Sequence, residues 1–114
     1  MVYYKSDTGD AAAVFGALSD STRLAIVMHL ASTDATINEI AEPFGMTLQA
    51  VSKHIRVLER AGLVQRQKIG RSNHCKLNHK ALEGANKKLT EIEKVWNSRL
   101  DRLGEFLESM HSPH

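Results

Sequence analysis

The segment TINEIAEPFGMTLQAVSKHIRVLER, residues 36–60, decides the fold of this chain. It opens with a capping box, in which the Thr36 side chain can accept a hydrogen bond from the backbone N–H of Glu39 and the Glu39 side chain can accept one from that of Thr36. We expect the helix that follows to end early, because Pro43 cannot donate a helical hydrogen bond and Gly45 tolerates the left-handed conformation of a helix end. The predicted buried stripe of this helix is Ile37, Ile40, Ala41 and Phe44.

A second helix is predicted from a cap at Thr47 to about Arg60, with only Gly45 and Met46 between it and the first helix. Two short helices joined in this way are typical of a helix-turn-helix motif. The predicted inward face of the second helix is Leu48, Val51, Ile55 and Leu58.

The opposite face of the second helix carries side chains that suit DNA. Gln49 can pair with adenine, Lys53 can reach guanine, and Ala50 permits close approach or contacts a thymine methyl group. Residues on the flanks of the helix suit phosphate oxygens. Together with the cap residue, the candidate DNA-binding residues of this helix are Thr47, Gln49, Ala50, Ser52, Lys53, His54 and Arg56.

Charge is segregated along the chain, although the net charge is only +2. Residues 47–76 hold seven lysines or arginines and a single acid, Glu59, which gives +6, whereas the remaining residues hold eight basic and twelve acidic side chains, which gives −4. A solvated surface of mixed charge does not predict such segregation. The pattern therefore indicates that one surface is directed at a polyanion.

The N-terminal part is predicted to form two helices, residues 10–18 and 21–31, after a flexible lead-in over residues 1–9. A short polar run at residues 19–21 separates the two helices and supplies the cap of the second. The predicted apolar faces are Val14, Phe15 and Leu18 for the first helix, and Leu24, Val27, Met28 and Ala31 for the second.

Two further elements complete a mainly α chain with a small β-hairpin. Residues 63–76 are expected to form the hairpin, with a five-residue turn at residues 69–73. Residues 81–110 are expected to form one long helix, followed by a tail over residues 111–114. The apolar residues of this helix follow a heptad pattern and are too many for a domain of this size to cover: Leu82, Ala85, Leu89, Ile92, Trp96, Leu100, Leu103, Phe106, Leu107 and Met110.

Three stretches closely resemble the ArsR family of winged-helix repressors: LSDSTRLAIV at residues 18–27, EIAEPFGM at residues 39–46, and VSKHIRVLERAGLV at residues 51–64. The resemblance extends over residues 11–110. It implies a single winged helix-turn-helix domain with a long C-terminal dimerisation helix. Ser21 stands where the family usually has proline, which costs a little preorganisation of the helix.

The resemblance also implies a function, namely a homodimeric repressor that binds an inverted repeat in double-stranded DNA. The hairpin would be the wing, with phosphate or minor-groove contacts from Lys68, Arg71, Ser72, Asn73 and His74. The dimer interface would combine the first and last helices through Val14, Phe15, Leu18, Leu89, Ile92, Trp96, Leu100, Leu103, Phe106 and Leu107.

We expect no metal and no cofactor. Thiolate sensors of the family carry a cysteine pair on the helix that corresponds to residues 39–44, and this chain has no cysteine there. Another class of sensor binds zinc through aspartate and histidines on the terminal helices, and here the long helix has no histidine before His111. The single cysteine, Cys75, is expected to be a small strand residue; the alternative is a redox switch whose thiolate is favoured by Arg71 and Lys76.

Several other function classes are excluded, and two stay open. The chain has no GxSxG, P-loop, GxGxxG or paired acidic motif, so we do not expect an enzyme. It has no export signal and no run of about 18 apolar residues, and its single cysteine suits a reducing compartment, so a cytoplasmic location without a membrane partner is expected. The open alternatives are a nonspecific architectural DNA-binding protein and a protein-interaction module that uses the heptad helix. The sequence identifies no effector.

Overall fold

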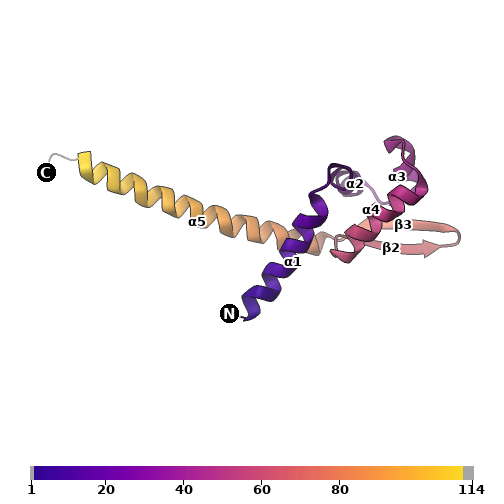
Figure 1. The fold of residues 1–114 in the computed structure, drawn as a ribbon, viewed down its shortest axis with the longest axis horizontal. Helices are drawn as coiled ribbons and strands as arrows, with labels where there is room; N and C mark the ends of the chain where they lie inside the picture. Colours follow the sequence, from indigo (N-terminus) through magenta and orange to yellow (C-terminus); the bar gives the residue numbers. More distant parts are fainter. Residues whose placement is uncertain (1, 112–114) are drawn as a thin grey trace.

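The computed structural model describes residues 2–111, and the side chains of residues 9–111. Over these residues the molecule is elongated, with dimensions of 76 × 34 × 19 Å, because the last helix extends far beyond the body formed by the other elements (Figure 1). The elements in chain order are α1 (Val2–Leu18), α2 (Ser21–Ser32), β1 (Ala35–Thr36), α3 (Ile37–Phe44), α4 (Leu48–Arg60), β2 (Val64–Ile69), β3 (Ser72–Leu77) and α5 (His79–His111).

The helix-turn-helix segment folds as its sequence predicts. The backbone N–H of Thr36 donates to a carboxylate oxygen of Glu39 at 2.8 Å, and the backbone N–H of Glu39 donates to the Thr36 hydroxyl at 3.2 Å, which confirms the capping box. Gly45 ends α3 with a φ of 61°, in the left-handed region. The hydroxyl of Thr47 accepts from the backbone N–H of Ala50 at 3.1 Å and so caps α4.

The core lies where α1 to α4 meet the sheet and the start of α5. The largest fully buried side chains are Val51, Ile55 and Leu58 from α4, with Ile26, Ile40, Leu63 and Cys75 from the surrounding elements. From α5, the core receives one fully enclosed side chain among the described residues, that of Ala85.

One predicted member of the α4 stripe does not join this core. Leu48 is 51% exposed, although it lies three residues before Val51 on the same helix face. The prediction that Leu48 faces inward is therefore wrong. The first turn of α4 borders an open hollow rather than a packed element. The apolar spacing of the helix therefore extends one turn beyond the part that the core covers.

The helix α1 buries the predicted face only in part, with Val14 in the core as predicted and two alanines beside it. Ala11, Val14 and Ala17 are buried, whereas Phe15 is exposed and Leu18 is half-buried. Small alanine side chains allow α1 to pack closely against its neighbours α2 and α5. The helix therefore turns its alanines toward them and leaves the larger Phe15 exposed. The helix also begins at Val2 rather than near residue 10, since residues 2–10 contain no proline that would interrupt it. Of the lead-in expected at residues 1–9, Met1 and the side chains of residues 2–8 lie outside the described part.

The helix α2 also departs from prediction in its buried face. Asp20 caps it by accepting from the backbone N–H of Arg23 at 3.0 Å. Residues 24–31 are apolar at nearly every position, so periodicity alone could not choose a face. Burial falls on Ile26, Val27 and Leu30, and the predicted Leu24, Met28 and Ala31 are exposed.

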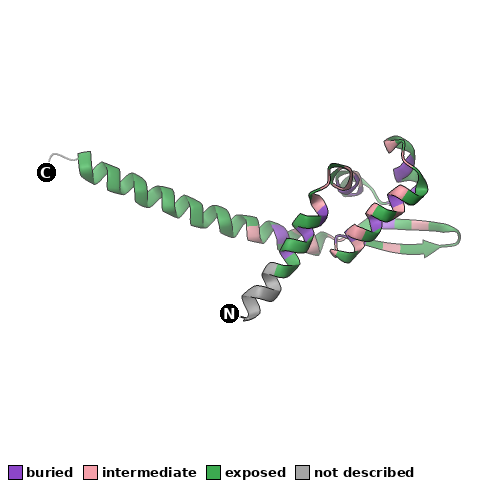
Figure 2. Cartoon of the chain, viewed as in Figure 1, coloured by how far each residue is buried: buried purple, intermediate pink, exposed green. Residues whose placement is uncertain are grey.

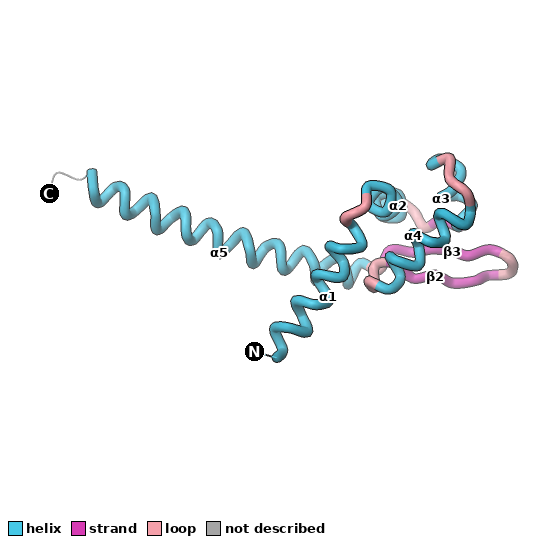
Figure 3. The backbone as a smooth tube through the Cα atoms, in the orientation of Figure 1, coloured by secondary structure: helices cyan, strands magenta, loops and turns pink. Residues whose placement is uncertain are grey.

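The hairpin belongs to a three-stranded antiparallel sheet in which β3 is the central strand between β1 and β2. Ile69 pairs with Ser72, so the loop consists of Gly70 and Arg71 only and is shorter than the predicted five residues. Gly70 has a φ of 61°, and a positive φ at the first of two loop residues is what a type II′ turn requires. The loop projects beyond the body on the side away from the end of α5 (Figure 3).

The helix α5 begins at His79, slightly earlier than predicted, and reaches His111; residues 112–114 of the expected tail lie outside the described part. Beyond its first turns its surface is almost entirely exposed (Figure 2). Within residues 2–111 no single helix is long and apolar enough to cross a membrane, although by length and composition the pair Gly9–Leu18 and Ser21–Ser32, bent by 101°, passes that test.

A first prediction concerns the centre of the core. Replacing the fully buried Ile55 with alanine is expected to lower the free energy of unfolding by about 2–5 kcal/mol, because the truncation removes apolar contacts and leaves a cavity. Ile69→Ala is the matched control, since Ile69 is 55% exposed on β2 and its truncation is expected to cost less than about 1 kcal/mol. Urea denaturation of both variants at one protein concentration measures the difference. Equal losses would contradict the assigned core.

A second prediction concerns the capping box. The hydrogen bonds that Glu39 accepts from the backbone N–H and then the hydroxyl of Thr36 hold its pKa below the usual value of 4.5. Because the folded-state pKa is the lower one, the ionised carboxylate stabilises the fold above pH 4.5, and this contribution is lost as the pH falls through the folded-state pKa. Glu39→Gln keeps an acceptor but does not titrate. Between about pH 6 and about pH 3, the free energy of unfolding should fall more in the wild type than in Glu39→Gln. Parallel pH curves in urea denaturation would contradict this account.

Candidate nucleic-acid interface

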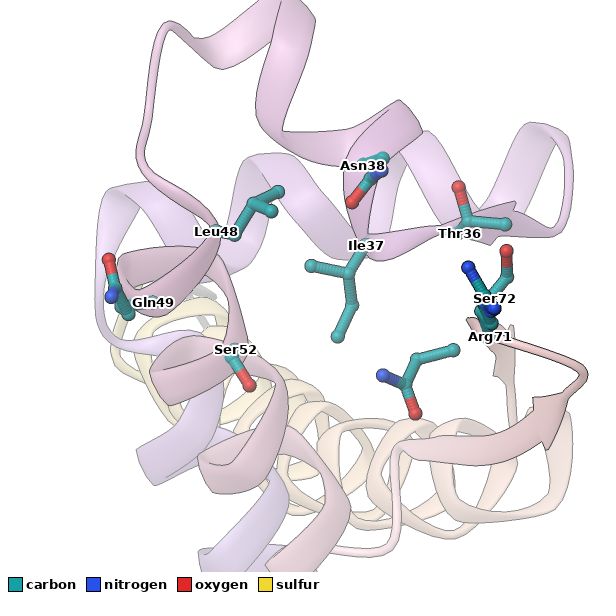
Figure 4. A pocket seen from close by; sticks show the side chains of 9 residues that line it. Thr36, Ile37, Asn38, Leu48, Gln49, Ser52, Arg71 and Ser72 are labelled. Atoms are coloured by element: carbon teal, nitrogen blue, oxygen red, sulfur yellow. The ribbon is translucent and has the colours of Figure 1, made fainter.

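A hollow of about 330 Å³ lies between the N-terminal ends of α3 and α4 and the tip of the β2–β3 hairpin; we call it the hairpin hollow. Its lining residues are Thr36, Ile37, Asn38, Leu48, Gln49, Ser52, Arg71, Ser72 and Asn73. Figure 4 shows Leu48, Gln49 and Ser52 on one side and Arg71 and Ser72 on the other. The start of α4 and the hairpin tip therefore border one common surface.

Five of the twelve predicted DNA-binding residues line the hairpin hollow: Gln49, Ser52, Arg71, Ser72 and Asn73. The other seven, Thr47, Ala50, Lys53, His54, Arg56, Lys68 and His74, lie outside its lining. Lys53 and Arg56 are exposed along α4, and Lys68 is exposed on β2, where it pairs with Asn73. These cations thus belong to α4 and the hairpin, the elements that border the hollow, but do not line it.

Among the seven, the side chains of Thr47 and His54 lie close to polar groups of the protein itself. The Thr47 hydroxyl oxygen already accepts the capping hydrogen bond from Ala50. His54 is half-buried and lies near Asp20, the cap of α2. The pKa of Asp20 is lowered chiefly by the hydrogen bond from the backbone N–H of Arg23, and the positive charge of Arg23 acts in the same direction. His54 is therefore close to the start of α2.

An ion pair within the basic segment sets its one negative charge against one of its seven positive charges. Glu59 at the end of α4 lies 3.0 Å from the guanidinium of Arg66 on β2. Glu59 is the only acid within residues 47–76, so the segment offers no second carboxylate to its other six basic residues. The pair also joins the C-terminal end of α4 to the hairpin.

The base of the hairpin is fixed by Asn78, which follows β3. Its side-chain amide donates to the carbonyl of Gly62 at 2.9 Å, and its backbone N–H donates to the carbonyl of Leu63 at 2.7 Å. Gly62 has a φ of 81°, which glycine adopts without strain as the chain turns from α4 into β2. These bonds set the direction in which the hairpin leaves α4.

Four residues of the hairpin hollow were missed by sequence reasoning: Thr36, Ile37, Asn38 and Leu48. The first three lie at the start of α3, and β1 brings them close to the hairpin because Thr36 pairs with His74 on β3. A strand of two residues has no periodicity to detect, so only the long-range pairing reveals this position. Leu48 was assigned to the core by its spacing.

Cys75 is fully buried in β3. Burial raises the pKa of its thiol, and the charge of Arg66 acts in the opposite direction. The pKa of this thiol is therefore governed by burial and not by Arg71 and Lys76. These observations favour the structural role over the redox switch.

The described residues contain no group of three or more histidine, cysteine, aspartate or glutamate side chains placed to hold a metal ion. The absence of a metal in the functional protein stays a prediction.

Comparison with known proteins places this geometry in a family. A model described as a helix-turn-helix domain matches residues 18–67. The HTH-type transcriptional regulator Rv2034 of Mycobacterium tuberculosis is 30% identical over 93 residues, which cover 82% of this chain and 84% of that protein.

Two solved structures share the fold over most of their length. An ArsR-like transcriptional regulator from Rhodococcus sp. RHA1 has a TM-score of 0.76 and 30% identity, and covers 87% of this chain and 93% of its own. The second is a homodimeric winged helix-turn-helix DNA-binding domain from Mycobacterium bovis, described as a possible ArsR-family regulator. It has a TM-score of 0.63 and 25% identity, and the match covers 97% of this chain and 94% of that domain. This chain therefore belongs to the ArsR family of winged helix-turn-helix transcriptional regulators.

Proposed function

We propose that this regulator binds double-stranded DNA as a homodimer, at an inverted-repeat operator, and represses transcription by occluding it. In this proposal α4 enters the major groove and the β2–β3 hairpin, as the wing, contacts the neighbouring backbone or minor groove. The observation that carries the proposal is the hairpin hollow, where the start of α4 and the wing tip border one surface.

The start of α4 supports reading of bases. Gln49 is exposed and can pair bidentately with adenine, and the exposed Lys53 one turn later can reach guanine. Between them the small side chain of Ala50 lets the helix approach the bases closely. A helix whose first turns carry short or amide side chains, with cations farther along, matches what the major groove requires.

The wing supports contacts to the DNA backbone. Arg71 is the second residue of the two-residue loop, and it is exposed at the farthest point of the hairpin. A guanidinium in this position can enter a narrow minor groove, where the negative potential is strongest. Ser72 and Asn73 follow on the wall of the hollow and can donate to phosphate oxygens.

The apolar face of α5 supports the homodimer. Ile92, Val95 and Trp96 line an apolar groove of about 570 Å³ between α1 and α5, opposite Phe15. The stripe continues along α5 through the exposed Leu100, Leu103, Phe106 and Leu107. A contiguous apolar face of this extent marks an interaction surface, and the similar Mycobacterium bovis domain is homodimeric.

Two of the predicted interface residues have other roles in the protomer. Val14 is buried in the core, so it has no exposed surface to lose on dimerisation, and we leave it out of the interface. Leu18 is half-buried against the same core.

Arg99, which interrupts the heptad pattern, lies over the ring of Trp96 at 5.4 Å from its centroid, and this cation–π contact keeps its charge beside the apolar stripe.

A third prediction tests DNA recognition by two substitutions with different expected effects. With a site selected from random DNA by the wild type, Lys53→Ala should relax base preference at one position of each half-site, at a cost of about 1–3 kcal/mol for the preferred sequence. Arg71→Ala should weaken binding to all sequences alike and reduce the salt slope by about 1 for each subunit. Competition between the selected site and random DNA at several salt concentrations measures both effects.

Arg102→Ala, which removes an exposed arginine of α5, is the matched control and should leave both quantities unchanged. A wild type that binds random DNA as tightly as any selected site would indicate an architectural protein instead of a regulator of specific operators. If Arg71→Ala altered base preference without altering affinity, the wing assignment would be wrong.

A fourth prediction tests the dimer. Leu103→Glu places a charge in the apolar stripe of both subunits and should convert the dimer to a monomer while the protomer stays folded, since Leu103 is exposed there. Lys94→Glu introduces the same side chain outside the stripe and should leave the dimer intact. Sedimentation equilibrium measures the association. The monomer should bind the operator about 100-fold more weakly or worse, because two half-sites no longer act together. A Leu103→Glu variant that stays dimeric would place the interface elsewhere.

A further inference from the structure

Leu48 is a large apolar side chain on the polar surface that is proposed to face DNA. It is the first residue of α4, directly after the cap Thr47 and before Gln49. It is 51% exposed and lines the hairpin hollow together with Ser52 and Arg71. A single exposed leucine is ordinary on a protein surface, so its position, and not its exposure alone, is what calls for an explanation.

The distribution of the other exposed apolar side chains sets Leu48 apart. Among the described residues, nearly all of them lie on α1, α2 and α5, away from the hairpin hollow. The exceptions are Leu48 and Ile69, and Ile69 lies near the wing tip without lining the hollow. Leu48 is thus the large apolar side chain that stands exposed at the start of the helix proposed to read DNA.

The chemistry of leucine narrows what Leu48 can contact. It has no donor or acceptor, so it cannot bind a phosphate or the polar edge of a base. In the major groove the apolar group that a base presents is the C5-methyl of thymine. The deoxyribose rings are also partly apolar, but they lie along the backbone, outside the groove that the first turn of α4 is proposed to enter. At the N-terminal end of α4, beside Gln49, Leu48 is placed to meet a base edge.

We propose that Leu48 is a specificity-determining residue that selects thymine by contact with its C5-methyl group. This inference rests on the proposed DNA binding and adds a base preference that the polar side chains of α4 do not provide. Gln49 would read adenine by hydrogen bonds, while Leu48 would distinguish thymine from cytosine, and from uracil, by one methyl group.

The experiment couples a change in the protein to the removal of one methyl group from the DNA. A binding site is first selected from random DNA with the wild-type full chain. Each thymine of that site is then replaced, one at a time, by deoxyuridine, which lacks the methyl group and keeps the base pairing. The dissociation constants of wild type and Leu48→Ala are measured for every DNA at one salt concentration.

We expect one thymine in each half-site at which deoxyuridine weakens wild-type binding about fourfold, as for the loss of one buried methyl group, and does not weaken binding by Leu48→Ala. Leu48→Met keeps a long apolar side chain and should retain the sensitivity. Leu24→Ala is the matched control, because Leu24 is 46% exposed on α2 and does not line the hollow, and it should show the wild-type profile. Thermal unfolding of Leu48→Ala should match that of the wild type, because no core contact is removed.

Three results would overturn the inference while leaving DNA binding intact. The first is the same sensitivity to deoxyuridine in wild type and Leu48→Ala at every thymine. The second is a uniform loss of affinity in Leu48→Ala with no coupling to any methyl group, which would indicate contact with deoxyribose. The third is a selected site with no thymine shared by the two half-sites. A wild type that selects no site at all would instead refute the proposed function, and the inference with it.

Discussion

The burial of Val51, Ile55 and Leu58 along one face of α4 is the contact on which the rest of the structure depends. A helix is rigid about its axis, so fixing these three side chains in the core also fixes the direction of Gln49 and Lys53 on the opposite face. A shift of one residue in this register would turn the helix by about 100° and would bring polar side chains into the core. The capping hydroxyl of Thr47 sets where the helix begins, and therefore which residues occupy its first turn.

Electrostatics acts on the same helix at its other end. The pair of Glu59 and Arg66 is partly exposed and contributes little to stability as such. The pair engages the single acid of residues 47–76 with Arg66, so the six other basic side chains of the segment carry its net charge of +6. The pair also ties the end of α4 to β2, as Asn78 ties β3 to the turn after α4. The wing is thus held to the helix it is proposed to assist by contacts at its base, while its loop stays exposed for contact with a partner.

Local signals predicted the fold best. Thr36, Glu39, Gly45 and Thr47 act within a few residues of themselves, and each has the role that its chemistry predicts. The misses arose where distant parts of the chain decide the outcome. The face of α2 could not be chosen from a run of apolar residues, and β1 exists only because Ala35 and Thr36 pair with β3. Leu48 continues a helical stripe that the surrounding elements do not cover. The polar residues of α4 and the hairpin that line the hollow were therefore predictable, but its shape, the residues that the start of α3 adds to it, and the place of Leu48 were not.

The position of α5 separates two aspects of recognition in the proposed dimer. Of its described residues only Ala85 is buried in the core, so most of its apolar face is free for assembly and contributes little to holding α4. Within one half-site, base choice then depends on side chains at the start of α4, which the core orients. Between half-sites, the distance of about 34 Å that separates successive major-groove faces depends on how the two α5 helices pair. A substitution on α5 can therefore alter which operator spacing is bound without changing any contact to a base, whereas a substitution at the start of α4 alters the base preference and leaves the spacing as it was.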